Sequence, residues 1–254
     1  MRVGLQFLTT RPRPALYMWP FYPLTVCYVA SGCGRVTQLD IETGQATVLM
    51  NLNPAGWVGD VKSWRMLYGL DVCGQKDCAY VGDDLGRMHI VDARLRRRGG
   101  SGGAGRGGTG GDGAASTSSA STWAGTYQLA TKGTKVQSIH VHPLDSNLIL
   151  TGGNDRFARL FDVRMLRPDA DAAAAIVARW PAPGLAAAAS PHKSKGTIAP
   201  LASFAHGGVI NAVQFSPLGT KFMTTCQDNR LRIWDNIHGP MSREVGNMGA
   251  GWPS

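Results

Sequence analysis

The chain has 254 residues, 43% of them hydrophobic and 17% charged, with a formal net charge of +9. Such a chain can bury the core of one large domain or two small ones, and it holds no apolar run of about 18 residues that could cross a membrane. The positive charge favours an acidic partner such as nucleic acid, although one basic loop with scattered lysines would give the same total.

The first 24 residues are the hardest to interpret. They are basic and contain four prolines, which break any apolar stretch, so residues 1–24 are not expected to form a signal peptide. The five cysteines come after this segment and form no C-x-x-C pair. Free thiols in a reducing compartment are therefore expected.

Four segments repeat one pattern: a turn rich in Gly, Asn or Asp, an alternating strand and a closing Asp. They read "GCGRVTQLD", "GDDLGRMHIVD", "GNDRFARLFD" and "CQDNRLRIWD", and they end at Asp40, Asp92, Asp162 and Asp235. Once two low-complexity inserts are left out, the closing acids lie roughly 40 to 50 residues apart. This is the period of WD repeats, which supply four strands per propeller blade.

The segments before the last two closing acids have the alternation of short strands. "KVQSIHVHP" and "VINAVQFSP" alternate and stop at proline, while "NLILTGGND" and "KFMTTCQDN" read as second strands that end in a turn. No helical period of apolar residues competes with this pattern. The sequence therefore predicts an all-β fold, a WD-repeat β-propeller of about four blades with two disordered inserts.

The expected organisation follows from these repeats and from composition. It is an uncertain segment at 1–24, two blades at 25–98, a Gly/Ser-rich insert at 99–122, a third blade at 123–167, an Ala/Pro-rich insert at 168–200, a fourth blade at 201–240 and a tail at 241–254.

A well-formed repeat ties its blade together by hydrogen bonds among a His, a hydroxyl residue, the turn Asp and the Trp. In the fourth repeat these would be His206, Asp228 and Trp234, with Cys226 at the hydroxyl position. A thiol is a weak donor, so this network is expected to be incomplete. The same is expected in the third repeat, which has Asp155 with Gly153 and Phe161 at the equivalent positions.

Signals for catalysis and cofactors are weak. The G-x-G-x-x-G match that begins at Gly100 lies in a glycine tract without the strand and helix of a dinucleotide site, so it reads as linker. His140 and His142 share one strand face and could form a metal pair, but no further ligand is evident, and packing is the alternative. The sequence predicts a protein that is not an enzyme, with no catalytic residue, metal or cofactor.

Several segments resemble one family of WD-repeat proteins, the small subunits of UV-damaged-DNA-binding complexes, most closely those of plants and algae. They are "LDIETGQATVLMNLNPAGW", "SWRMLYGLDV", "GNDRFARLFDVRML" and "FSPLGTKFMTTCQDNRLRIWDNIHG". The resemblance implies a nuclear protein of nucleotide excision repair that recognises damaged double-stranded DNA. It also implies a substrate receptor that joins a cullin–RING ubiquitin ligase through the large damage-binding subunit.

For partner docking, the resemblance points to the end of the W-D-x-R phrase. Arg164 fits the docking position, with Asp162 and Asp155 in the same motif, and Arg94 in "VDAR" is a second candidate. An arginine held at a strand end can present its planar guanidinium to an acceptor on the partner. The alternative for Arg164 is an ion pair within its own propeller.

For DNA, the resemblance points to loops on one face of the propeller. Lys132 and Lys135 would approach phosphate, Trp64 and Tyr127 would stack on or wedge between bases, and Arg35 is a weaker phosphate candidate. The alternatives are packing between blades for Trp64 and a solvated loop for the two lysines. A WD-repeat adaptor that docks to the ligase but binds a protein instead of a lesion is the rival function, and a non-functional fragment is the third alternative.

The chain also departs from the family pattern. The lesion-inserting hairpin, an N-terminal docking segment, a zinc knuckle and three of an expected seven blades are not visible in the sequence. The chain is therefore interpreted as truncated relative to the family: a fragment, a truncated gene model or a divergent paralogue.

Overall fold

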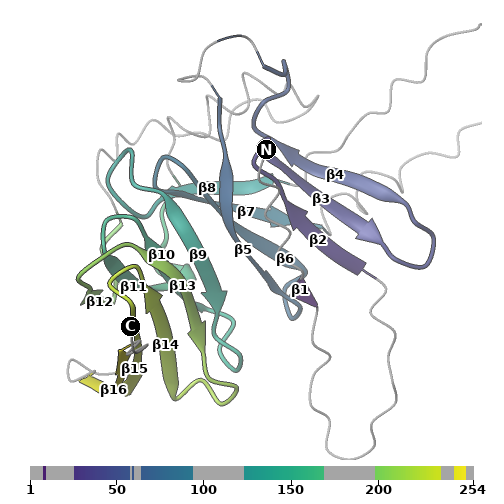
Figure 1. Ribbon diagram of the computed structural model, residues 1–254. Coiled ribbons are helices and arrows are strands. Elements are labelled where there is room, and N and C mark those ends of the chain that lie inside the picture. The colour runs from purple at the N-terminus through teal and green to yellow at the C-terminus, as the bar shows by residue number, and fades with distance from the viewer. Residues whose placement is uncertain are drawn as a thin grey trace, which may run out of the picture.

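The computed structural model describes residues 8–9, 26–57, 59, 64–93, 123–168, 198–235 and 243–249. These residues form four antiparallel sheets of four strands each, and their one helical element is a single 3-10 turn, Val163–Met165. The predicted all-β architecture of WD-repeat propeller blades is confirmed. In Figure 1 the sheets follow one another in chain order, from purple to yellow.

Each sheet is a meander of consecutive strands. The first contains β1 (Leu8–Thr9), β2 (Val26–Ala30), β3 (Arg35–Asp40) and β4 (Ala46–Asn51). The second contains β5 (Leu67–Cys73), β6 (Cys78–Asp83), β7 (Arg87–Asp92) and β8 (Trp123–Gln128). The third contains β9 (Val136–Val141), β10 (Leu148–Gly153), β11 (Phe157–Asp162) and β12 (Ala202–Ala205). The fourth contains β13 (Ile210–Phe215), β14 (Lys221–Cys226), β15 (Arg230–Asp235) and β16 (Arg243–Gly249).

The pairing of the fourth strands differs from the expected division of the chain. β8 lies after the first insert yet pairs with β7, and β12 lies after the second insert yet pairs with β11. Residues 123–128 therefore complete the second sheet and residues 202–205 the third, so each insert interrupts a sheet between its third and fourth strands. The first sheet likewise takes in β1, from the segment left uninterpreted at 1–24.

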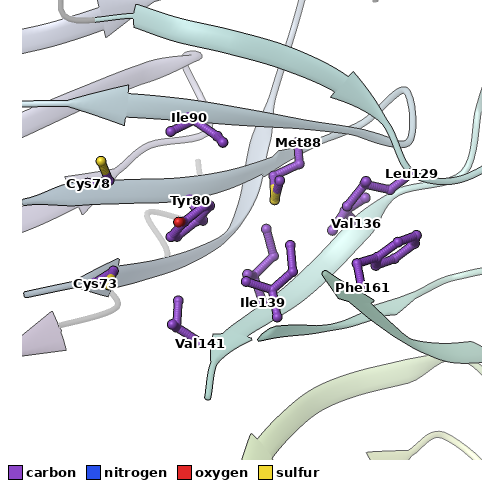
Figure 2. Close-up of a cluster of buried hydrophobic side chains, with 11 residues drawn as sticks. Cys73, Cys78, Tyr80, Met88, Ile90, Leu129, Val136, Ile139, Val141 and Phe161 are labelled. Carbon is purple, nitrogen blue, oxygen red and sulfur yellow. The ribbon is translucent and has the colours of Figure 1, made fainter. Parts of the chain in front are cut away.

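Apolar side chains fill the space between successive sheets. Figure 2 shows the cluster between the second and third sheets, where Tyr80 and Met88 face Ile139 and Phe161. A similar cluster joins the first and second sheets around Val36 and Leu70. Sequence alternation explains this arrangement, because every second residue of a strand points to the same face.

Hydrogen bonds link the first strands of neighbouring sheets at one repeated position. Asp71 on β5 accepts from the backbone N–H of Val141 on β9, and His140 on β9 accepts through Nδ1 from the N–H of Phe215 on β13 (3.3 Å). Burial raises the pKa of the Asp71 carboxyl to about 6. His140 therefore has a structural contact between sheets, which is the packing alternative to a metal pair.

The hydrogen-bond network of the fourth repeat uses a hydroxyl from a different residue than expected. His206 Nε2 lies 2.7 Å from Thr224 Oγ1, and Trp234 Nε1 donates to the same oxygen at 3.1 Å. The assignment of Cys226 to this position was wrong, because the hydroxyl comes from the residue two places earlier on the same face of β14. Cys226 instead contacts the side chain of Asp228, which is also paired with Arg232 (2.6 Å).

Candidate functional site

The connections between strands gather at two ends of the sheets, and these ends carry different chemistry. One end holds the β2–β3, β6–β7, β10–β11 and β14–β15 turns with the β4–β5, β8–β9 and β12–β13 loops. It is called here the Lys135 face. The opposite end holds the β3–β4, β5–β6, β9–β10 and β13–β14 turns and the start of the β11–β12 segment, and is called the Arg164 face. Antiparallel pairing fixes this division, since the chain reverses at each turn.

Backbone hydrogen bonds join the turns and loops of the Lys135 face into a continuous surface. Asn154 in the β10–β11 turn donates to the carbonyl of Lys135 (3.2 Å), while its side chain accepts from the Lys135 N–H (2.7 Å). Asp84 in the β6–β7 turn donates to the Met66 carbonyl in the same way (3.1 Å). The loops that carry the predicted DNA-binding residues are therefore anchored by the turns of the next sheet.

The Lys135 face carries exposed cations without partners. The predicted residues Arg35 and Lys132 are exposed, and so are Arg156 and Arg230, which sequence reasoning did not single out. The signal for the last two was their place in the repeat, in or directly after the β10–β11 and β14–β15 turns. None of these four side chains forms an ion pair within the described part of the chain.

The acids that the structure describes on this face are paired. Asp84 pairs with Arg65 (3.4 Å), Asp228 with Arg232 (2.6 Å) and Asp155 with Arg159 (2.6 Å). The Asp155 contact is an ion pair alone, because that oxygen has no hydrogen-bond partner. Because these acids are paired with neighbouring arginines, they do not neutralise the four exposed cations. The face therefore presents a positive surface.

Two tryptophans lie together at the β4–β5 loop. Trp64 donates through Nε1 to the carbonyl of Gly32 (3.3 Å), which fixes its ring. Trp57 packs edge-on against it, with ring centroids 5.5 Å apart, and 57% of Trp57 stays exposed. Trp57 was not proposed from the sequence, although it ends the segment "NLNPAGW". The pair offers an aromatic surface beside the cations.

Lys135 lies over another aromatic ring. Its Nζ is 5.1 Å from the centroid of Tyr68 on β5, a cation–π contact between the second and third sheets. Such a contact orients the ammonium without neutralising its charge. Lys132 and Lys135 share the β8–β9 loop, so the structure brings both predicted lysines to the face that also holds Trp64 and Arg35.

Tyr127 lies apart from this group. It is half-buried in β8 and packs against the cluster between the second and third sheets, and burial raises the pKa of its hydroxyl. Its ring therefore contributes to the core rather than to the exposed aromatic surface of Trp57 and Trp64.

On the Arg164 face, Arg164 is both paired and exposed. It lies in the 3-10 turn after β11, where its Nε and Nη2 donate to Asp162 at 3.0 and 2.6 Å. This hydrogen bonding lowers the pKa of Asp162 and raises that of Arg164. The alternative of an internal ion pair is thus realised, yet 68% of the Arg164 side chain remains exposed and its other N–H groups point to no described acceptor.

Exposed aliphatic side chains occupy the same face. Leu144 follows β9, Leu218 follows β13 at the equivalent position, and Met165 follows Arg164 in the 3-10 turn. Lys76 holds the β9–β10 loop in place by donating to the Ser146 carbonyl (2.9 Å). Exposed apolar side chains on the same face as a fixed guanidinium are typical of a protein-docking site.

One of the predicted docking residues, Asp155, does not lie with Arg164. Asp155 lies at the other end of β11, on the Lys135 face, where it pairs with Arg159. Arg94 falls outside the described residues. Arg164 and Asp162 are therefore the two that the structure brings together.

The described ranges contain no group of three His, Cys, Asp or Glu side chains that could hold a metal ion, and no helix long and apolar enough to span a membrane. His142 is buried, with Nε2 3.0 Å from the Gly219 carbonyl and Nδ1 accepting the N–H of Asp145. It ties β9 to the β13–β14 turn.

Comparisons with known proteins agree with this architecture. The family model described as "WD domain, G-beta repeat" matches residues 198–235, which span β12 and the first three strands of the fourth sheet. The matched repeat therefore starts one strand before the fourth sheet, which fits sheets that form WD-repeat propeller blades.

The chain is similar to two plant proteins over most of its length. It is 33% identical to DNA damage-binding protein 2 of Oryza sativa subsp. japonica over 222 residues, 86% of this chain and 29% of that protein. It is 33% identical to the protein DAMAGED DNA-BINDING 2 of Arabidopsis thaliana over 210 residues, 81% of this chain and 28% of that protein. The resemblance expected from the sequence is confirmed, and the chain spans less than a third of each relative.

Proposed function

We propose that this chain is a non-enzymatic, nuclear DNA-damage sensor whose Lys135 face binds damaged double-stranded DNA. The observation that carries the proposal is the surface on which cations without an ion-pair partner among the described residues share one face with the Trp57–Trp64 pair, of which Trp57 is exposed. The similarity to proteins named for damaged-DNA binding supports the same ligand. Damaged duplex differs from intact duplex chiefly in the ease with which bases leave the stack, and aromatic side chains bind unstacked bases.

In this proposal, the cations supply affinity and the aromatic residues supply selectivity. Arg35, Lys132 and Lys135 neutralise phosphates without reading sequence, as a sensor of lesions at any site requires. Trp57 and Trp64 stack on a base or wedge between bases at the lesion. Such stacking contributes about 1–3 kcal/mol per base.

We further propose that the Arg164 face docks to the large subunit of the damage-binding complex and, through it, to a cullin–RING ubiquitin ligase in nucleotide excision repair. Asp162 fixes the guanidinium of Arg164, which leaves the outward N–H groups for an acceptor on the partner. The exposed Leu144, Met165 and Leu218 supply apolar contact around it.

The second candidate is a WD-repeat adaptor of the ligase that uses the Arg164 face alone and binds a protein on the other. The exposed aliphatic residues of the Arg164 face favour this adaptor, because binding a protein through them does not require nucleic acid. The two candidates are separated by titrating the full chain with UV-irradiated and intact duplexes of one sequence. Tighter binding to the irradiated duplex supports the sensor, whereas no binding to either with retained capture of the large subunit supports the adaptor.

A further inference from the structure

Arg156 occupies a backbone position that is left-handed in every sheet. The equivalent residues lie six places before the closing Asp, and their φ angles are 78° at Gly34, 79° at Gly86, 68° at Arg156 and 59° at Asn229. Glycine adopts this conformation freely and asparagine tolerates it, whereas a long side chain is disfavoured there. Arg156 is thus the strained member of the set.

The fold requires this conformation, because it directs the backbone carbonyl of the left-handed residue toward the following loop. The carbonyl of Gly34 accepts from the N–H of Leu52 (2.8 Å), and that of Arg156 accepts from the N–H of His206 (2.9 Å). The carbonyl of Gly86 accepts in the same way from the N–H of Leu129 (2.9 Å). The β10–β11 turn therefore cannot relax to a conformation that would suit an arginine without losing its contact with the β12–β13 loop.

Packing does not require an arginine at this position. At Gly34 and Gly86 a β-carbon would come within 2.8 and 2.9 Å of a backbone carbonyl, so those positions exclude a side chain. The Arg156 side chain is exposed and forms no hydrogen bond or ion pair with any residue that the structure describes. The adjacent acid, Asp155, is paired with Arg159 instead.

We propose that Arg156 binds a DNA phosphate and so extends the Lys135 face across the third sheet. A strained residue without an internal contact is explained by an external ligand. A guanidinium is suited to a phosphate because it can donate two parallel hydrogen bonds. Arg156 lies two residues after Asn154, whose side chain holds the Lys135 backbone, so the lysine and the arginine are fixed on adjoining segments. This inference rests on the proposed function, since it names one contact of the same surface.

The test is the salt dependence of binding to a UV-irradiated duplex by the full chain and its variants. Arg156→Gly removes both the charge and the strain, so it should unfold at a urea midpoint at or above that of the wild type while binding DNA more weakly. The slope of log K against log salt should fall by about 0.9, the value for one phosphate contact. Arg156→Asn tolerates the left-handed backbone and should behave in the same way. Arg167→Gly removes one exposed charge from the Arg164 face and should leave the slope unchanged.

Each outcome has one meaning. A reduced slope in both Arg156 variants, with the Arg167 control unchanged, supports the contact. An unchanged slope in the Arg156 variants, or an equal loss in the Arg167 control, overturns it while leaving damaged-DNA binding by the wild type intact. A wild-type chain that binds no DNA overturns the proposed function, and this inference with it.

Discussion

Asp155 and Arg164 flank the same strand, β11, but lie on opposite faces of the molecule. Asp155 belongs to the β10–β11 turn and pairs with Arg159 at 2.6 Å, whereas Arg164 lies past the far end of β11 and pairs with Asp162. The six residues of β11 span roughly 20 Å. The phrase "GGNDRFARLFDVRML" therefore connects two surfaces, one basic and aromatic and the other carrying Arg164 and exposed aliphatic side chains.

The separation of the faces predicts that docking can be lost without loss of DNA binding. Arg164→Ala should reduce co-purification with the large damage-binding subunit at least tenfold, because a hydrogen bond to a charged group contributes about 1.5–3 kcal/mol. The exposed side chain contributes little to folding, so the urea midpoint should not change. Arg167→Ala, at the exposed residue three places further along the chain, is the matched control. Equal capture of both variants and the wild type would refute the docking role of Arg164.

The aromatic pair on the Lys135 face predicts a selectivity variant. Trp57→Ala should lower affinity for an irradiated duplex by at least about fivefold and leave affinity for an intact duplex nearly unchanged, since stacking contributes about 1–3 kcal/mol per base. Folding should be retained because the ring is largely exposed. Leu218→Ala, at an exposed residue of the opposite face, serves as the control in the same anisotropy titration. A parallel loss for both duplexes would show that Trp57 does not discriminate damage.

The hydroxyl of Thr224 predicts a stability defect in the fourth sheet. Thr224→Val removes the partner of both His206 and Trp234, so the free energy of unfolding should fall by about 1–3 kcal/mol. Thr225→Val, next along β14 and without a side-chain hydrogen bond to any residue that the structure describes, should change it by less than about 0.5 kcal/mol. Urea unfolding followed by tryptophan fluorescence measures both. If the two variants lose equal free energy of unfolding, the hydrogen bonds of the Thr224 hydroxyl do not stabilise this sheet.

Asp71 predicts an unusual pH dependence. Its pKa is about 6 in the folded chain against 3.8 for an ordinary Asp, so the folded state holds this proton more tightly than the unfolded state. The contribution of Asp71 to stability should therefore decline as pH rises from about 4 to 6, by about 3 kcal/mol in all. Relative to Asp71→Asn, the wild type should lose stability over this range.

Asp228 serves as the control for that measurement, because its contribution to stability changes with pH in the opposite direction. Hydrogen bonds from Arg232 hold the pKa of Asp228 well below its usual range. Its stabilising effect is present above pH 4 and declines as pH falls below it. A wild-type curve parallel to that of Asp71→Asn between pH 4 and 7 would contradict the burial of an ionisable Asp71 between the sheets.

The sequence was sufficient for the strands and insufficient for their grouping into sheets. Alternation and the closing acids such as Asp162 and Asp235 predict β11 and β15, because local spacing determines both. The fourth strands β8 and β12 come after long inserts and carry no closing signal, so their partners depended on pairing across sequence distance. The same limit explains why Asp155 was grouped with Arg164, since adjacency in a motif does not reveal which end of a strand a residue occupies.

The candidate site was predicted in part for similar reasons. Lys132 and Lys135 share one loop, so the sequence alone put them together. Trp64 precedes β5 and the lysines follow β8, so the strand order of the second sheet brings them to the same end. Arg156 and Arg230 occupy turn positions that the repeat pattern marks, but only the folded chain shows that these turns lie on the same face as the two lysines. The half-buried position of Tyr127 could not be foreseen, because a half-buried ring and an exposed one look alike in a sequence, and its role at DNA stays a prediction.

Damaged-DNA recognition by the Lys135 face is tested most directly by one paired titration. The wild type and the Lys132→Glu/Lys135→Glu double variant are each titrated with irradiated and intact duplexes over a range of salt concentrations. The wild type should prefer the irradiated duplex, and the double variant should bind both more weakly with a shallower salt dependence. Equal affinity of the wild type for the two duplexes, or an unchanged salt dependence in the variant, would contradict it.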